Sequence, residues 1–119
     1  MSLSFKIEEH TSGVMNIDLE GKILAGDETD QVQEAIENGL KQQVKLFIID
    51  LSQVTYINSS GLNLFLRLFT KVRNKAGELI YVSPSDTVKQ LLAISKLDSI
   101  FTICADKEEA LNLLNAKKA

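Results

Sequence analysis

The chain has 119 residues, of which 45% are hydrophobic and 24% are charged, so it can bury a core without disulfides or metals. Its formal net charge of −3 argues against a nucleic-acid partner, because binding a polyanion needs a basic face. The single cysteine, Cys104, excludes an internal disulfide and fits a reducing compartment.

The N-terminal residues and the lengths of the apolar runs indicate where the protein resides. Charged and polar residues from Lys6 to His10 stand where a signal peptide would need an apolar stretch. The apolar runs are too short to cross a membrane. We therefore expect a cytoplasmic protein, with no direct membrane insertion, that forms one domain over residues 1–119.

The first third of the chain predicts a hairpin followed by a helix. Residues 3–10 and 14–20 are expected to be strands, joined at a turn around Gly13. In the second strand, alternation predicts one buried side and one wetter side. Residues 28–41 carry apolar residues at helical spacing, with Asp27 as the expected N-cap.

The middle of the chain predicts a buried strand and the strongest helix. Residues 44–51 are almost continuously apolar, which is typical of a central parallel strand covered on both faces. Residues 59–76 predict a helix that Gly77 ends. Its expected core stripe consists of Leu62, Phe65, Leu66, Phe69 and Val72.

The last third predicts two more strands, each followed by a helix. Residues 79–82 are expected to be a strand, and residues 86–94 a short helix capped by Ser85 or Asp86. Residues 101–104 predict a short strand in which Cys104 is a small core residue. The final helix, 106–115, begins with a pattern that resembles a capping box, Asp106 with Glu109.

The order β-β-α-β-α-β-α-β-α indicates an α/β fold. Strands that alternate with helices predict a largely parallel sheet with crossover helices. The opening hairpin adds an antiparallel pair. We therefore expect a single-domain mixed β-sheet flanked by about four α-helices.

Residues able to perform catalysis are scarce. His10 is the only histidine, and no motif for a Ser-His-acid triad surrounds it. One histidine and one cysteine do not make a zinc site. Neither a Walker loop nor a glycine-rich dinucleotide fingerprint is present. We expect no enzyme activity, no catalytic residue, no cofactor and no metal.

One segment, Val54 to Leu62, predicts a functional turn. A central strand ends there and a helix begins at Asn58-Ser59-Ser60-Gly61. Function in open α/β sheets gathers beyond the carboxyl ends of strands, and the unpaired N–H groups of a helix start favour an anion. The alternative is an ordinary helix start, with Asn58 or Ser59 as N-cap and Gly61 placed for close packing.

The frame around this turn resembles the STAS domains, and among them the bacterial anti-sigma factor antagonists. The resemblance covers nearly the whole chain. It depends on the order and spacing of four segments: Phe47-Ile48-Ile49-Asp50-Leu51-Ser52, Val54-Thr55-Tyr56-Ile57-Asn58-Ser59-Ser60-Gly61-Leu62, Gly77-Glu78-Leu79, and Val88 to Phe101 with Leu91, Ile94 and Leu97.

The resemblance implies a function for the turn. Antagonists of this family bind an anti-sigma factor that is also a serine kinase, and the unmodified protein frees the sigma factor. The kinase phosphorylates the first serine of an Asp-Ser-Ser-Gly-like turn, and a serine phosphatase reverses the modification. By position, that serine is Ser59. The domain is thus expected to be a phosphoprotein that regulates transcription.

This chain departs from the family pattern at Asn58, where phosphorylated members commonly have Asp. Asn still caps a helix, but the lost charge opens a second hypothesis. The domain would then be a constitutive STAS adaptor, such as an accessory subunit of a lipid or anion transporter. Phosphate incorporation with a cognate kinase separates the two.

The expected partner surface combines the turn with the loop that precedes the first helix. Leu64 and Leu68 lie off the centre of the core stripe, so they face either a partner or a neighbouring helix. The expected contact residues are Gly26, Asp27, Asn58, Ser59, Ser60, Gly61, Leu62, Asn63 and Leu64.

Overall fold

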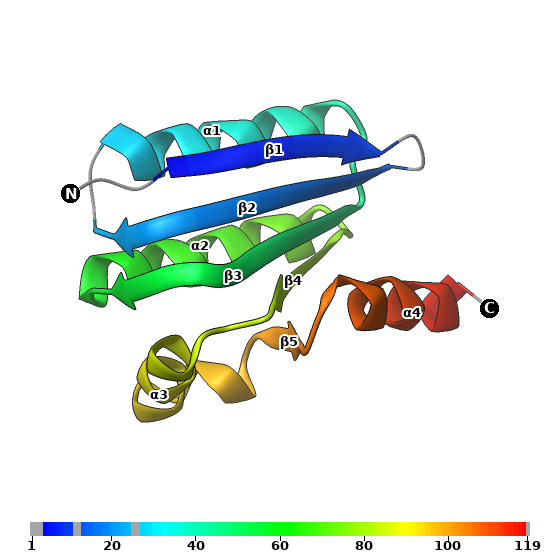
Figure 1. Ribbon diagram of the computed structural model, residues 1–119. Coiled ribbons are helices and arrows are strands. Elements are labelled where there is room, and N and C mark those ends of the chain that lie inside the picture. The colour runs from blue at the N-terminus through cyan, green and yellow to red at the C-terminus, as the bar shows by residue number, and fades with distance from the viewer. Residues whose placement is uncertain (1–3, 11–12, 25–26, 119) are drawn as a thin grey trace.

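The predicted alternation of strands and helices is present in the computed structural model, which describes residues 4–10, 13–24 and 27–118 (Figure 1). The strands are β1 (Ser4–His10), β2 (Val14–Ile23), β3 (Leu46–Ile57), β4 (Glu78–Val82) and β5 (Thr102–Cys104). The helices are α1 (Asp27–Lys41), α2 (Ser59–Asn74), α3 (Asp86–Ile94) and α4 (Lys107–Lys118), and a 3₁₀ turn spans Leu97–Ser99. The fold class inferred from the sequence is confirmed.

The sheet has the strand order β1-β2-β3-β4-β5, so spatial order follows chain order. β1 is antiparallel to β2, and the later pairs are parallel. Right-handed crossovers that always step in one direction place their helices on one face of a sheet. Consistent with this rule, buried side chains of α1, α2 and α3 belong to one core cluster, whereas α4 contributes to a second.

Helix α4 explains one departure from the expected strand pattern. The side of β2 predicted to be wetter contains Val14 and Asn16, and both are buried. Val14 belongs to the cluster that Ala110 of α4 completes. The alternation is therefore visible only farther along β2, where Asp18 is half-buried and Glu20 is exposed.

β3 is longer than the sequence pattern indicated, since it continues to Ile57 and not only to Leu51. β2 also extends beyond its expected end and pairs with β3 as far as Ile23↔Ile57. Two register shifts interrupt this pairing. Such bulges change which side a residue faces, so the simple two-residue alternation is lost although the strand goes on.

The buried face of α2 differs from the predicted stripe. Leu64 and Leu68 are buried, while Leu62 and Leu66 are only partly buried. α2 packs against α1 as well as against the sheet, so its buried face turns toward the neighbouring helix. The placement of Leu64 toward a partner was wrong, because α1 and the sheet enclose that side of the helix.

The C-terminal end of α2 adopts a Schellman geometry. The N–H of Gly77 donates to the carbonyl of Val72 at 3.0 Å, and the N–H of Ala76 donates to Arg73 at 3.0 Å. The left-handed residue of this motif is Ala76, with φ of 61°. Gly77 is needed for space, because a Cβ there would lie 3.1 Å from the carbonyl oxygen of Lys45.

Two predicted helix caps are confirmed. Ser85 Oγ accepts a hydrogen bond from the N–H of Val88, and it donates to the carbonyl of Val54 at 3.0 Å. Asp106 Oδ1 accepts from the N–H of Glu109 at 2.8 Å. Cys104 is buried as expected, and this burial raises the pKa of its thiol, which keeps it in the weakly nucleophilic protonated form.

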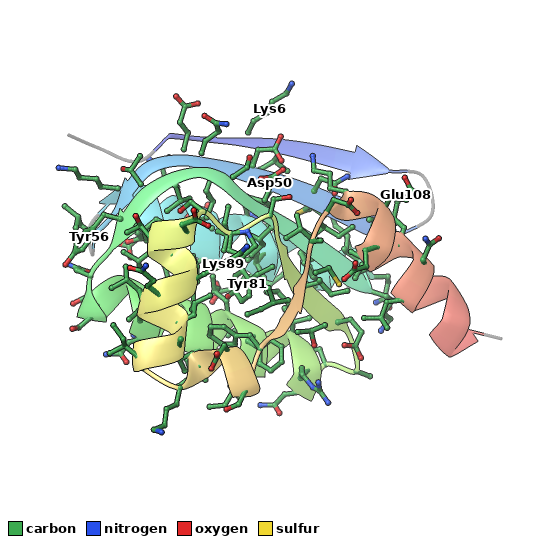
Figure 2. The ribbon with its side chains drawn as sticks, turned by 60° about the horizontal axis from the view of Figure 1, so that its bottom comes forward. Lys6, Asp50, Tyr56, Tyr81, Lys89 and Glu108 are labelled. Atoms are coloured by element: carbon green, nitrogen blue, oxygen red, sulfur yellow. The ribbon has the colours of Figure 1, made fainter. Side chains whose placement is uncertain are left out.

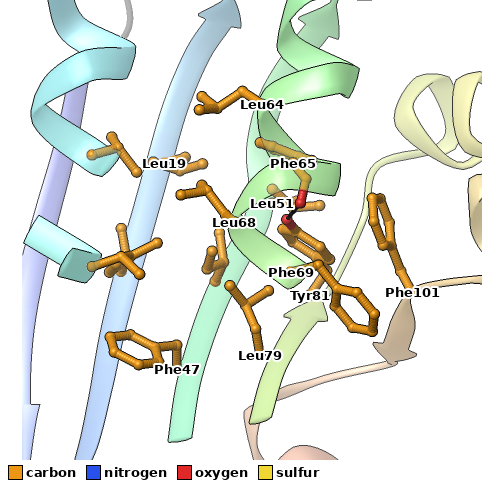
Figure 3. Packing of buried hydrophobic residues seen from close by; sticks show 14 of the residues in the cluster. Leu19, Phe47, Leu51, Leu64, Phe65, Leu68, Phe69, Leu79, Tyr81 and Phe101 are labelled. Carbon is orange, nitrogen blue, oxygen red and sulfur yellow. Dashed lines mark hydrogen bonds between the residues drawn. The ribbon is translucent and has the colours of Figure 1, made fainter. Parts of the chain in front are cut away.

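Tyr81 joins three parts of the main core (Figure 3). Its ring stacks on Phe65 of α2 with centroids 4.7 Å apart and lies 4.9 Å from the ring of Phe101. Its hydroxyl donates to the carbonyl of Phe65 at 2.9 Å. The sheet, α2 and the segment before β5 are thus connected through one buried phenol.

The Tyr81→Phe variant is expected to lose about 1 kcal/mol of stability at neutral pH, the usual net contribution of one hydrogen bond. Burial raises the pKa of Tyr81 well above its usual value. The neutral phenol is therefore favoured by folding, and its contribution is complete below the unfolded pKa of about 10 and is lost as pH rises above it. Urea titrations from pH 8 to 11 should show a shallower alkaline loss for Tyr81→Phe than for wild type. Tyr56→Phe, at the exposed tyrosine, should keep the wild-type slope; equal slopes for all three proteins would contradict the prediction.

Candidate functional site

The candidate site lies at the carboxyl ends of β2 and β3. Ile23 and Ile57 are paired in the sheet, and the N–H of Asn58 donates to the carbonyl of Ile23 at 3.2 Å. The connections that lead to α1 and α2 therefore start side by side. Gly26 lies outside the described residues. Asp27 is the first residue of α1 and not the residue before it, and its side chain lies outside the described part.

Asn58 is the N-cap of α2. Its backbone is extended, and its side-chain oxygen accepts a hydrogen bond from the N–H of Gly61 at 2.8 Å. Its carbonyl accepts from the N–H of Leu62 at 2.9 Å. These bonds settle the choice that the sequence left open between Asn58 and Ser59 as the cap.

Ser59 and Ser60 occupy the first turn of α2, and both are exposed. Their backbone N–H groups have no hydrogen-bond acceptor among the described residues. Accessibility with unpaired donors was predicted for the whole Asn58–Gly61 turn and is confirmed for Ser59 and Ser60. Gly61 is buried, and the N–H groups of Asn58 and Gly61 donate to Ile23 and Asn58. An anionic group on either hydroxyl would lie where the helix dipole favours negative charge.

Gly61 sets the distance between α2 and the sheet. It is buried, and a Cβ at this position would lie 2.7 Å from Cγ2 of Ile57 and 2.8 Å from the carbonyl oxygen of Ile23. No real Cβ tolerates such contacts with backbone. The glycine is therefore what allows the serine turn to approach the end of β2.

The remaining predicted contact residues differ in accessibility. Asn63 is exposed and Leu62 is half-buried, so both can contribute to a surface around the turn. Leu64 is only 4% exposed and belongs to the main core. It is unavailable to a partner in this fold.

Two exposed apolar side chains near the turn were not predicted. Tyr56, just before the cap, is 43% exposed, and Leu24, just after β2, is 40% exposed. Tyr56 lies at the C-terminal end of β3, where Figure 2 labels it. Its cross-strand neighbour Lys22 is exposed too. The sequence shows an aromatic residue, Tyr56, close to the turn. The bulges in the pairing of β2 with β3 mean that strand alternation does not predict which face of the sheet its side chain lies on.

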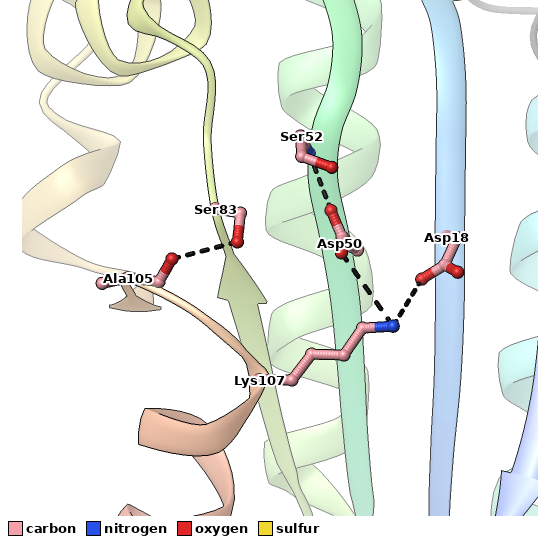
Figure 4. Close-up of polar contacts among 6 residues, drawn as sticks. All are labelled: Asp18, Asp50, Ser52, Ser83, Ala105 and Lys107. Carbon is pink, nitrogen blue, oxygen red and sulfur yellow. Dashed lines mark hydrogen bonds and ion pairs between the residues drawn. The ribbon is translucent and has the colours of Figure 1, made fainter.

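A polar cluster connects α4 to the sheet, on the face opposite to the one that α1, α2 and α3 cover (Figure 4). Lys107 Nζ lies 3.1 Å from Asp18 and 4.0 Å from Asp50, two carboxylates that are cross-strand neighbours. Asp50 also accepts from the N–H of Ser52 at 2.8 Å. The positive charge of Lys107 offsets the repulsion between the neighbouring carboxylates of Asp18 and Asp50. The cluster is therefore explained by its contribution to the fold, and we assign it no binding role.

Neither a metal site nor a membrane span is found within residues 4–10, 13–24 and 27–118. No group of three or more His, Cys, Asp or Glu side chains there could hold a metal ion. Over the same residues, no helix combines the length and apolarity that a membrane crossing requires.

The Asn58→Ala variant is expected to lose about 1 kcal/mol of stability, because the N–H of Gly61 would lose its acceptor. Asn58→Asp should fold about as stably as wild type, since a carboxylate oxygen caps equally well and adds favourable charge at the helix start. Thermal melts of the two variants measure the difference. Equal melting temperatures for Asn58→Ala and wild type would show that the cap does not stabilise α2.

Comparison with known proteins gives one consistent result. Residues 6–110 match the family model of the STAS domain. An anti-sigma-B factor antagonist from Listeria monocytogenes is 31% identical over 87% of this chain and 90% of its own length. An anti-sigma F factor antagonist from Paenibacillus polymyxa is 27% identical over 96% and 97% of the two chains.

Solved structures show the same similarity. The anti-sigma factor antagonist SpoIIAA in its unphosphorylated form superposes with a TM-score of 0.79 at 26% identity, covering 95% of this chain and 97% of that one. The phosphorylated form of SpoIIAA, described as a Bacillus cell fate determinant, gives a TM-score of 0.73 at 25% identity, covering 93% and 99%. The similarity thus covers more than nine tenths of each chain.

Proposed function

Because this chain belongs to the STAS domain family, we propose that it is an anti-sigma factor antagonist whose capture of an anti-sigma factor is switched off by phosphorylation at Ser59. Its relatives carry names of regulatory proteins, and like them this protein is not an enzyme. The partner would be an anti-sigma factor that is also a serine kinase, a serine phosphatase would restore binding, and the cytoplasm is where the three would meet.

The observation that carries the proposal is the exposed Ser59 at the start of α2. A kinase needs an accessible hydroxyl, and Ser59 offers one beside unpaired backbone donors. SpoIIAA has been solved in unphosphorylated and phosphorylated forms, which supports modification of this kind in the fold.

The partner surface would combine the turn with its apolar neighbours. Ser59, Ser60 and Asn63 supply polar contacts, while Tyr56 and Leu24 supply apolar area next to them. Aromatic side chains flanked by polar groups are typical centres of protein interfaces. Gly26 and Asp27, which follow β2, would lie at the edge of this surface.

A second candidate is supported by Asn58. A neutral residue replaces the acidic one that commonly precedes the modified serine in the family, so recognition by a kinase could be absent while partner binding persists. The protein would then be a constitutive adaptor, such as an accessory subunit of a lipid or anion transporter.

Affinity capture from the native cell tests the proposal, followed by mass spectrometry of the bound proteins and of Ser59. An anti-sigma factor in the eluate, and ATP-dependent phosphate on Ser59 of the free protein, are expected. The Ser59→Ala variant is the control for the site of modification. Transporter subunits in the eluate, with Ser59 always unmodified, would favour the adaptor.

A further inference from the structure

A basic depression lies at the opposite end of α1 and α2 from the serine turn. It has a volume of about 530 Å³ and is lined by the last turn of α1, the connection to β3 and the end of α2. Its basic side chains are Lys41, Lys45, Lys71 and Lys75, and its one acidic side chain is Glu37.

A second depression, of about 600 Å³, continues over the outer face of α2 and shares Lys71 and Lys75 with the first. Leu66 lies in this second part, and Arg67 adds another cation. Together the two depressions form a groove with an apolar floor and a basic rim, which we call the lysine groove.

Among the described residues, Lys71 is the one cation of the lysine groove that forms an ion pair. Glu37 pairs with Lys71, and this hydrogen bond is the main reason that the pKa of Glu37 is lowered. Lys45 and Lys75 form no ion pair among the described residues. Helix dipoles favour cations at the ends of α1 and α2, but they do not account for Lys45 or for Arg67 in the middle of α2.

We propose that the lysine groove docks an acidic, amphipathic segment of a protein partner, at a surface separate from the turn at Ser59. Carboxylates of that segment would pair with Lys41, Lys45 and Lys75, and an apolar side chain would lie against Leu66.

The net charge and the shape of the groove favour this occupant. The whole chain carries −3, so a long polyanion such as nucleic acid would be repelled by the rest of the surface. A short segment senses only local charge, because screening limits electrostatic reach to about 8 Å at physiological salt. A small inorganic anion would use the lysines but not the apolar floor around Leu66.

The test is a titration of a short synthetic peptide of glutamate and leucine into the full chain, followed by NMR of backbone amides. Amides of residues 40–45 and 66–75 should shift, and those around Ser59 should not. Lys45→Gln/Lys75→Gln should weaken binding about fivefold or more, the effect of losing two exposed ion pairs. Lys89→Gln/Lys96→Gln, which removes the same charge from exposed positions in and just after α3, should bind as wild type does.

Three further arms identify the occupant. The same peptide with glutamine in place of glutamate should not bind, and inorganic pyrophosphate and phosphatidylglycerol vesicles should bind more weakly than the acidic peptide. Tighter binding of pyrophosphate or vesicles would overturn the proposal, as would equal binding by the two lysine variants. A dimer that Lys45→Gln/Lys75→Gln dissociates would show that a second copy fills the groove and would also overturn it.

Discussion

Replacing Ser59 by Asp is expected to weaken capture of the anti-sigma factor by about a hundredfold while leaving the domain folded. A charge introduced at this position must be desolvated against a partner surface shaped for a hydroxyl, and a buried charge without a partner costs several kcal/mol. Within the free protein the same charge lies at the start of α2, where the dipole stabilises it by about 0.3–1 kcal/mol. The loss should therefore fall on the complex and not on folding.

Titration of the purified partner against wild type, Ser59→Asp and Ser59→Ala measures the effect, with a thermal melt of each protein. Ser59→Ala should bind permanently, because it removes the hydroxyl that we propose is phosphorylated and adds no charge. Gln90→Asp is the matched control, since Gln90 is exposed in α3, lies outside the proposed contact surface, carries the same added charge and should bind as wild type does. Wild-type affinity of Ser59→Asp would show that the turn is not the switch, and an unfolded Ser59→Asp would mean that charge acts through stability.

Gly61→Ala should have the largest effect on stability among single-methyl changes at this site, a loss of about 2 kcal/mol. Alanine in a helix normally gains up to about 1 kcal/mol over glycine. Here the methyl group would lie 2.8 Å from the backbone oxygen of Ile23, which cannot rotate away. Overpacking of this kind costs about 1–3 kcal/mol and must outweigh the helix preference.

Urea denaturation of Gly61→Ala beside two control variants checks this prediction. Ser60→Ala changes the adjacent exposed residue and should stay within about 0.5 kcal/mol of wild type. Gly39→Ala meets side-chain atoms of Met15 and Phe47 at 2.9–3.1 Å, and because a side-chain end such as the Met15 methyl can move, its loss should be smaller than that of Gly61→Ala. A Gly61→Ala protein as stable as wild type would mean that α2 can shift away from β2 without cost.

Local chemistry explains why much of the fold was predictable. Ser85 and Asp106 cap their helices as expected because capping needs only the residues of one turn. The turn at Ser59 was also predictable, since a strand, small polar residues and an apolar helix follow each other directly in the sequence. The order of elements was predictable because each apolar pattern lies within one segment: alternation in residues 14–20, a continuous apolar run in residues 44–51, and helical spacing in residues 28–41 and 59–76.

Features that depend on two distant segments could not be predicted. The side of α2 that contains Leu64 is buried by α1, and nothing in the α2 sequence records that contact. The end of β3 was placed too early because the bulges opposite β2 change the direction of residues such as Tyr56. The lysine groove combines Lys41 and Lys45 with Lys71 and Lys75, which only the crossover between β3 and β4 brings together.

The strand order β1-β2-β3-β4-β5 has a consequence for synthesis on the ribosome. Each strand pairs with the strand made just before it, so no strand waits for a later segment to fill a gap between two older ones. The N-terminal part of the chain leaves the ribosome first, so β1, β2, α1 and β3 are available for pairing before α4 exists. Until α4 has been made, the face with Leu46 and Ile48 stays uncovered, so the nascent chain would expose this apolar surface until α4 emerges and packs against it.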